Sequence, residues 1–236
     1  MLIGHYGPAI WDTQRGRAAP IVKLWEAFLA VQAMDITAGI LVMFGLEGAA
    51  LNAAGDPIFH VPWSHSLVTS IGIALLAAVV YKTFRRSATR RAVIVIALLA
   101  FSHWVLDLVV HRPDLPIYPG GETLLGFALW DYPWVAFALE AGLLAAALIF
   151  WQRVTNAKSK IYDYAIWALF VLMCAVHFGF VTHQGLQVQN GTFDPSQTPP
   201  DIILGMGFLV VIGLFALLIG LIERGRPSTF SPEDAL

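Results

Sequence analysis

The chain has 236 residues, of which 58% are hydrophobic and only 13% are charged, and its mean hydropathy is +0.70. These values are typical of a protein with several membrane spans and exclude an ordinary soluble domain. The formal net charge of −2 gives no basis for nucleic-acid binding. Cys174 is the only cysteine, so no internal disulfide can form, and it lies in an apolar run.

Six long apolar stretches follow a short mixed segment, residues 1–20, which is too short to span a bilayer. They cover approximately residues 22–46, 62–81, 92–110, 134–151, 162–181 and 202–222. We therefore expect an all-α polytopic membrane bundle with about six transmembrane helices. Residues 1–223 would form one domain, with a loop at 47–62, a Pro- and Gly-rich connection at 111–133 that folds back on the bundle, and a flexible polar tail at 224–236.

Basic residues alternate between the two sides of this bundle. They precede the first stretch, follow the second and the fourth, and follow the sixth: Arg15, Arg17, Lys23, Lys82, Arg85, Arg86, Arg90, Arg91, Arg153, Lys158, Lys160, Arg224 and Arg226. The opposite loops carry almost only acidic residues and Arg112. Because cytoplasmic loops are enriched in Lys and Arg, we expect both termini in the cytoplasm.

The third apolar stretch ends in an unusual group of polar residues. His103, Asp107 and His111 are four residues apart, so a helix places them on one face. Imidazole and carboxylate groups are metal ligands, and ionisable groups inside a membrane helix mark functional sites. The alternative is structural: His103 bonds to a neighbouring helix, Asp107 pairs with Arg112, and His111 lies at the interface.

Other polar residues converge on the same, outer half of the bundle. Asp35 lies in the first stretch, His60 and His65 lie at the mouth of the second, and Glu140 lies in the fourth. Metal sites of helix bundles are built in this way, from side chains on facing helices. His5 falls on the cytoplasmic side and joins the site only if residues 1–12 re-enter the bundle.

These residues give a candidate site with two kinds of members. The candidate metal ligands are His5, Asp35, His60, His65, His103, Asp107 and His111. The candidate catalytic groups are Glu140 and Arg112, whose guanidinium can hold an anionic oxygen. Glu140 could be a general base, could support the ligands from behind, or could pair with Arg112.

Two segments resemble sequence elements of the YdjM-like family of inner-membrane metal-dependent hydrolases. The segment HVPWSHSL, residues 60–67, resembles the family's HxxxTHSL element, and SHWVLD, residues 102–107, resembles its SHxxLD element. The segment GHYG, residues 4–7, is similar to its THxxxG element. Asp35 stands where the family usually has paired acids. The resemblance covers roughly residues 1–150 and leaves out the last two spans.

This resemblance implies a zinc-dependent hydrolase in the bacterial inner (plasma) membrane, distantly related to zinc-dependent phospholipase C and to single-strand nucleases of similar fold. It implies one or two zinc ions and a phosphoester substrate that is a membrane lipid or is linked to one. Imidazoles and carboxylates suit Zn²⁺, and a bound divalent metal lowers the pKa of its water and polarises a phosphoryl oxygen.

Three other functions use the same residues. Transmembrane histidines such as His103 and His177 can be axial ligands of a haem in a redox protein. Intramembrane acids and histidines also form ion or metal pathways in transporters. A metal site with all its positions filled by the protein would be purely structural.

Overall fold

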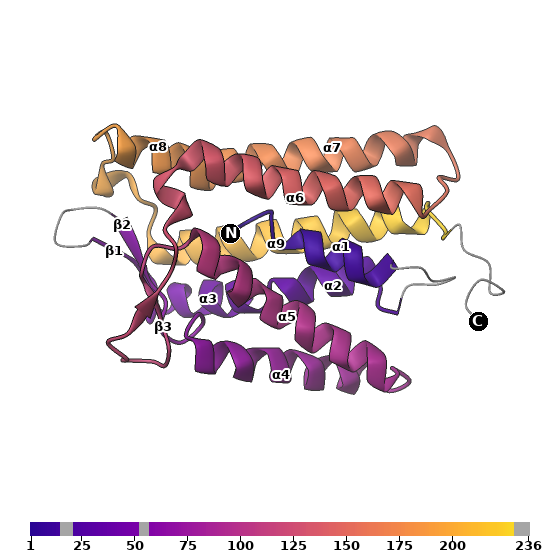
Figure 1. Ribbon diagram of the computed structural model, residues 1–236, viewed down its shortest axis with the longest axis horizontal. Helices are drawn as coiled ribbons and strands as arrows, with labels where there is room; N and C mark the ends of the chain where they lie inside the picture. Colours follow the sequence, from indigo (N-terminus) through magenta and orange to yellow (C-terminus); the bar gives the residue numbers. More distant parts are fainter. Residues whose placement is uncertain (15–20, 52–56, 229–236) are drawn as a thin grey trace.

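The protein is an elongated bundle of helices that lie roughly along one axis (Figure 1). Its computed structural model describes residues 1–14, 21–51 and 57–228. Within them, five helical segments are long and apolar enough to cross a membrane, and a sixth candidate is a bent pair of helices. The prediction of an all-α, multi-pass membrane bundle is thereby confirmed.

The helices are α1 (Tyr6–Gln14), α2 (Leu24–Val31), α3 (Ala33–Met43), α4 (Leu67–Phe84), α5 (Arg90–Val110), α6 (Pro133–Arg153), α7 (Lys160–His177), α8 (His183–Gln189) and α9 (Asp201–Arg224). Their first turns carry ordinary start signals. The hydroxyl of Ser66 accepts a hydrogen bond from the Thr69 N–H, and Thr89 does the same for Ala92. Pro133 is the first residue of α6, where its missing N–H costs nothing.

The first apolar stretch is a broken helix, where the sequence predicted a single span over 22–46. α2 and α3 meet at Gln32 with a bend of 55°. The Gln32 side chain is fully buried, and its amide nitrogen donates to the carbonyl oxygen of Leu2 at 3.2 Å. Such a break leaves the last carbonyl groups of α2 without partners in their own helix.

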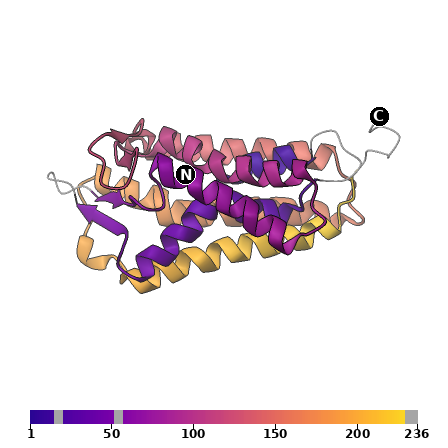
Figure 2. The same cartoon turned by 90° about the horizontal axis from the view of Figure 1, so that it is seen from below.

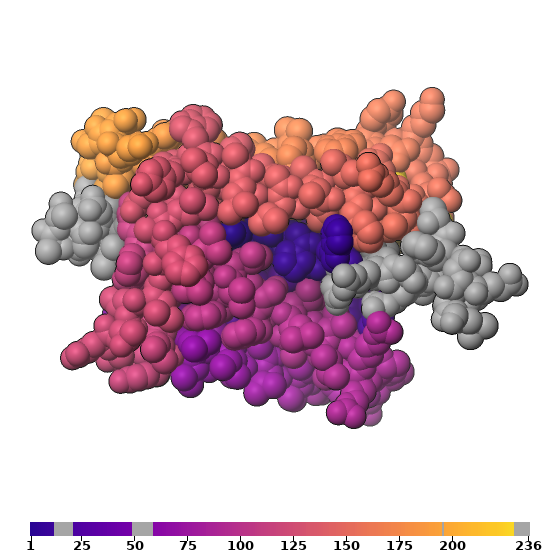
Figure 3. Space-filling model, in the orientation of Figure 1, coloured from indigo at the N-terminus to yellow at the C-terminus, as the bar shows by residue number. Residues whose placement is uncertain are grey.

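The N-terminal segment, residues 1–14, lies inside the bundle, which is the condition under which the sequence placed His5 at the site. α1 packs against α2, α5 and α6, and Tyr6, Ala9 and Ile10 are fully buried. Figure 3 shows only a strip of this segment between α5 and α6. Gly4 permits the close packing, because a Cβ there would lie 3.2 Å from Cγ of Glu140 and 2.6 Å from Sδ of Met1.

Two short hairpins close one end of the bundle. The expected loop at 47–62 contains an antiparallel pair, β1 (Gly48–Leu51) and β2 (Pro57–His60), which the sequence analysis did not predict. A second pair, β3 (Leu115–Pro116) and β4 (Leu124–Leu125), lies in the connection after α5. This connection folds back on the bundle as expected, because the N–H of Ala128 donates to the His111 carbonyl at 2.7 Å. Figure 2 shows both hairpins at the same end.

The last two spans pack beside these helices. α7 continues through a five-residue π-helix, Phe178–Thr182, into α8, so the predicted span at 162–181 is part of a longer helical segment, Lys160–Gln189. α9 packs against α2, α3 and α7. Its contact with α3 is close, since a Cβ on Gly205 would lie 2.4 Å from the carbonyl oxygen of Gly39.

The start of the C-terminal tail is ordered, in contrast to the flexible tail predicted over 224–236. Arg226 is buried, and it donates to Asp163 at 2.6 Å and to the hydroxyl of Thr155 at 3.0 Å. Ser228 forms a β-bridge with Thr155. The rest of the predicted tail, and the predicted cytoplasmic residues Arg15 and Arg17, lie outside the described residues.

A candidate metal centre

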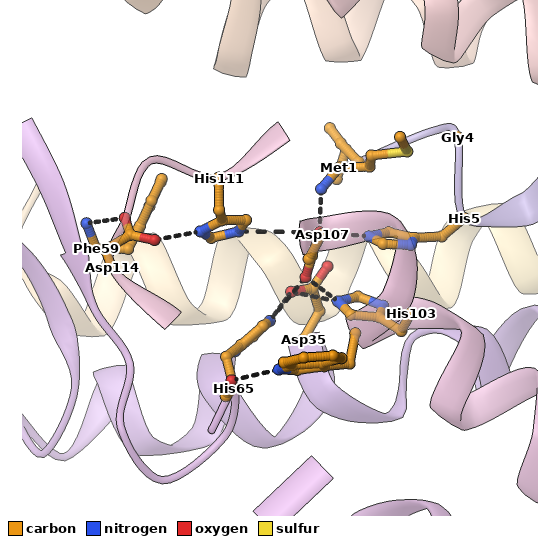
Figure 4. Close-up of polar contacts among 12 residues, drawn as sticks. Met1, Gly4, His5, Asp35, Phe59, His65, His103, Asp107, His111 and Asp114 are labelled. Atoms are coloured by element: carbon orange, nitrogen blue, oxygen red, sulfur yellow. Dashed lines mark hydrogen bonds and ion pairs between the residues drawn. The ribbon is translucent and has the colours of Figure 1, made fainter. Parts of the chain in front are cut away.

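Asp107 is the central residue of a buried group of imidazoles and carboxylates (Figure 4). It lies on α5, one turn after His103, and both side chains are buried. Oδ2 of Asp107 is 3.0 Å from Nε2 of His103 and 3.4 Å from Nε2 of His65. Oδ1 faces the other way, 3.1 Å from Nε2 of His5 and 3.8 Å from Nε2 of His111. The two oxygens of one carboxylate therefore face two different pairs of histidines.

A second carboxylate, Asp35, faces the first pair. Its Oδ1 lies 3.4 Å from Nε2 of His65 and 3.5 Å from Nε2 of His103. Asp35 is the third residue of α3, after Ala33 and Met34, so the break at Gln32 sets its position. The helix α3 thus brings a carboxylate from the first span to histidines of the second and third.

The six residues of this His/Asp cluster are His5, Asp35, His65, His103, Asp107 and His111. Within it, His5, His103 and Asp107 form one group, and Asp35, His65 and His103 form another; the ligand atoms of each lie within 4.8 Å of one another. Neighbouring ligands of a tetrahedral Zn²⁺ with bonds of about 2.1 Å are roughly 3.4 Å apart. The N–O distances of 3.0 to 3.5 Å around His65 and His103 match that separation. This buried His/Asp cluster can hold a metal ion.

The far ring nitrogens are also engaged. Nδ1 of His103 donates to the carbonyl oxygen of Val31 at 2.6 Å. Nδ1 of His111 is 2.9 Å from Oδ1 of Asp114. Since a carbonyl or a carboxylate can only accept, each bond keeps the proton on Nδ1 and leaves Nε2 to face the cluster. Metal-binding histidines are oriented by such bonds in known metal sites.

His65 is oriented by a longer chain of hydrogen bonds. Its Nδ1 lies 2.6 Å from Oγ of Ser64, and that hydroxyl is 2.6 Å from Oε2 of Glu47. The other oxygen of Glu47 accepts from the N–H groups of Trp63 and Ser64 at 2.7 and 2.8 Å. Glu47 is buried, so this carboxylate fixes both the turn before α4 and the direction of the His65 ring.

His5 belongs to the cluster because the N-terminal segment re-enters the bundle. The sequence placed His5 at the site only on that condition. Its ring stacks on that of His103 with the centroids 3.6 Å apart. His5 is fully buried, and burial favours the neutral imidazole, which is the state that binds metals. The amino group of Met1 also contacts Asp107.

One predicted ligand lies elsewhere. His60 is exposed in β2, where it pairs with Gly48, and it is in neither group of ligand atoms. Its side chain is exposed, whereas the ligand groups are mostly buried, so its prediction as a ligand finds no support. The spacing between His60 and His65 does not bring their side chains together, because residues 57–60 form a strand and α4 begins only at Leu67.

Glu140, a predicted general base or supporting group, contacts the N-terminal backbone. Its Oε2 accepts hydrogen bonds from the N–H groups of Leu2, Ile3 and Gly4 at 2.7, 3.0 and 3.1 Å. The same oxygen is 3.7 Å from Nδ1 of His177. Glu140 therefore holds the segment that carries His5, which makes it a positioning residue for the cluster.

Arg112, predicted to hold an anionic oxygen, contacts an aspartate after the second hairpin. Its Nε donates to Oδ1 of Asp131 at 2.6 Å, on the side of the protein toward the second hairpin. The predicted alternative, an ion pair between Asp107 and Arg112, is replaced by the contacts of Asp107 with four histidines. Arg112 instead lines a cavity beyond the cluster.

A small cavity of about 90 Å³ opens the cluster on one side. Asp35, His65 and His111 line it, together with the aromatic rings of Phe59 and Trp130. Since the remaining walls are mainly apolar, the cavity gives a small molecule access to the ligand atoms without opening the site to bulk water.

The fold and the site together define a multi-pass membrane protein with a buried His/Asp cluster that can hold a metal ion. A scan against protein-family models, a search of curated proteins and a search of solved structures each found no match to this chain.

Proposed function

We propose that this chain is a membrane-embedded, zinc-dependent hydrolase that cleaves a phosphoester of a membrane lipid or of a lipid-linked molecule. The single observation that carries the proposal is the position of Asp107. Its two oxygens face separate pairs of imidazoles, and three of these rings are held from behind by acceptors or hydroxyl groups. A set built only for packing would not need every Nε2 to converge on carboxylates.

The ligands divide into two groups that share His103. One would be Asp35, His65 and His103, and the other would be His5, His103 and Asp107. His111 lies 3.8 Å from Oδ1 of Asp107, at the edge of the second group. The donors fit zinc, because neutral imidazole and carboxylate are its usual nitrogen and oxygen ligands. Nε2 of His103 and Nε2 of His5 lie 3.0 and 3.1 Å from oxygens of Asp107 but form no geometrically aligned hydrogen bond within residues 1–14, 21–51 and 57–228, as expected of atoms that would share a cation.

When bound, zinc supplies Lewis acidity: it lowers the pKa of a water ligand and polarises a phosphoryl oxygen. The chain supplies orientation and exclusion of water. Asp35 is the cluster carboxylate nearest solvent, at 13% exposure, and it faces the 90 Å³ cavity where a phosphoester would approach. Phe59 and Trp130 cover the same cavity and keep it poor in water.

The membrane setting favours a lipid substrate. The cluster lies at the end of α5 that leads to the second hairpin, away from the basic loops at the start of α5 and after α6 (Figure 1). If those loops face the cytoplasm, as the positive-inside rule predicts, the site lies in the outer half of a bacterial inner membrane. A phosphorylated headgroup in that leaflet would be within its reach.

The test is hydrolysis and metal content in the same preparations. We expect purified chain to contain zinc and to release p-nitrophenol from bis(p-nitrophenyl) phosphate. His103→Ala should lose both the zinc and the activity, whereas the matched variant His60→Ala should keep both, because His60 is exposed and outside the cluster. Equal zinc contents in the two variants would refute the ligand assignment.

The same zinc and hydrolysis measurements test two of the alternative functions. Zinc without hydrolysis of the synthetic diester or of phospholipid vesicles would make the metal site structural. Zinc flux into liposomes without hydrolysis would make the chain a transporter. The haem alternative is not favoured, because His103 faces Asp107 and Asp35 while His177 faces Glu140.

A further inference from the structure

A larger cavity of about 370 Å³ lies beside the small one. It is enclosed by α6, the π-helix, α8 and α9. Five residues line both cavities: Phe59, Trp130, Val181, Leu204 and Phe208. The two spaces are therefore neighbours: the small one contacts the His/Asp cluster, and the larger one lies beside it, among the last two spans.

The larger cavity contains buried polar atoms that the protein leaves without partners. His177 is fully buried and Thr182 is 2% exposed. Neither ring nitrogen of His177, nor the hydroxyl of Thr182, nor Nε1 of Trp130 has a hydrogen-bond partner among the residues that the structure describes. All three side chains line the cavity. Because an unpaired buried polar group costs free energy, these atoms indicate a polar occupant.

The backbone is also unusual at this point. The π-helix Phe178–Thr182 interrupts the α-helical pattern between α7 and α8. Such segments are rare and occur frequently at functional sites. This one brings Gly179, Val181 and Thr182 to the cavity wall, and a Cβ on Gly179 would meet nothing within 4 Å. The π-helix therefore forms part of the cavity wall.

Arg112 and Asp194, which line the cavity, already have hydrogen-bond partners within the protein. Arg112 pairs with Asp131, and Asp194 accepts hydrogen bonds from Ser196 and Gln197. The polar atoms that remain are an imidazole, a hydroxyl and an indole N–H, all without formal charge. They suit an uncharged group with hydroxyl or ester oxygens better than a second anion.

The cavity also reaches the surface that faces the bilayer. Phe180 of the π-helix and Phe208 of α9 both line it, and their ring centroids are 6.5 Å apart. Phe180 is 47% exposed on a helical segment apolar enough to span the membrane. A lipid chain leaving the cavity beside this pair of rings would lie in the hydrocarbon region, with no need to pass through water.

We infer that this cavity binds the uncharged, oxygen-bearing part of a lipid, such as its glycerol esters, and so brings the adjoining phosphoester to the His/Asp cluster. The inference rests on the proposed function. It assigns His177 and Thr182, which lie outside the cluster, to substrate binding, with Trp130 as a third donor.

The test is equilibrium binding of radiolabelled 1,2-dioctanoylglycerol to the full chain in detergent micelles, with empty micelles as the blank. This probe carries one hydroxyl and two ester carbonyls and no charge. We expect saturable binding that weakens about tenfold in His177→Leu and in Thr182→Val, because each loses one hydrogen bond. His177→Gln should keep most of the affinity, since its amide restores a donor and an acceptor.

Matched controls are His60→Leu and Thr83→Val, which change the same residue types at exposed positions. Their affinity should equal that of the unaltered chain. Equal binding by all variants, or full competition by hexadecane, would overturn the inference, because the cavity would then be only an apolar space. Zinc content should not change in any of them. If the unaltered chain binds the probe but contains no zinc or does not hydrolyse the diester, that result contradicts the proposed function and leaves the inferred binding site standing.

Discussion

Nδ1 of His103 lies 2.6 Å from the backbone carbonyl oxygen of Val31, although 72 residues separate the two. Val31 is the last residue of α2, and the bend at Gln32 turns its carbonyl away from an uninterrupted helix. The break in the first span therefore orients a histidine of the third. The same break sets the position of Asp35, so a single irregularity of the backbone places two members of the cluster.

The hydrogen bonds behind the cluster should affect metal affinity. Ser64→Ala removes the hydroxyl that links Nδ1 of His65 to Glu47, so the ring loses its orientation. We expect zinc affinity to fall by about 10- to 100-fold, as is typical for such partners. Competition with a zinc chelator measures this. Ser196→Ala, in an exposed position, is the control, and an unchanged affinity in Ser64→Ala would contradict the assigned role.

Glu140 should stabilise the buried N-terminal segment. In Glu140→Ala three N–H groups lose their acceptor, and we expect the protein to be destabilised by about 2 to 4 kcal/mol. Hydrogen exchange of residues 1–14 should become faster, while that of α9 should change less. Glu122→Ala, at an exposed loop position, should leave both unchanged. Unaltered exchange at residues 1–14 would show that Glu140 does not hold them.

Arg226 should be a structural anchor at the end far from the cluster. Its guanidinium contacts Asp163, Thr155 and the ring of Trp151 while buried. Arg226→Ala should lower the thermal midpoint by several degrees, because buried acceptors lose a charged donor. The zinc content should stay the same. The exposed Arg153→Ala is the control, and a loss of zinc in Arg226→Ala would mean that the two ends are coupled.

The orientation of the bundle can be tested with single cysteines. In a Cys174→Ser background, Glu122→Cys and Arg86→Cys place exposed thiols at opposite ends of α5. If the basic loops are cytoplasmic, an impermeant maleimide added to intact cells should label the first and spare the second. The reverse pattern would place the His/Asp cluster in the cytoplasmic half of the membrane.

The sequence predicted the parts of the site that follow from regular helices. His103, Asp107 and His111 were placed on one face because four residues make about one turn, and the structure has them on that face of α5 and at its end. Asp35 and His65 were placed near them by the length of each span. These inferences needed only helix geometry and the membrane thickness.

Other parts depend on contacts that no local pattern encodes. The charge rule put His5 on the wrong side, because it treats residues 1–14 as a cytoplasmic segment and cannot foresee that Glu140 binds their N–H groups. Glu47 gave no signal, since its role depends on the turn before α4. Asp114 lies three residues after His111, a spacing that could have identified it.

The most direct test of the account is the zinc content per chain of purified protein, measured by elemental analysis with and without Asp107→Asn. The account predicts one or two zinc ions in the unaltered chain and in His60→Asn, and a loss of that zinc in Asp107→Asn, whose side chain is nearly the same size. Zinc at the same level in all three proteins, or none in the unaltered chain after purification with zinc present, would contradict it.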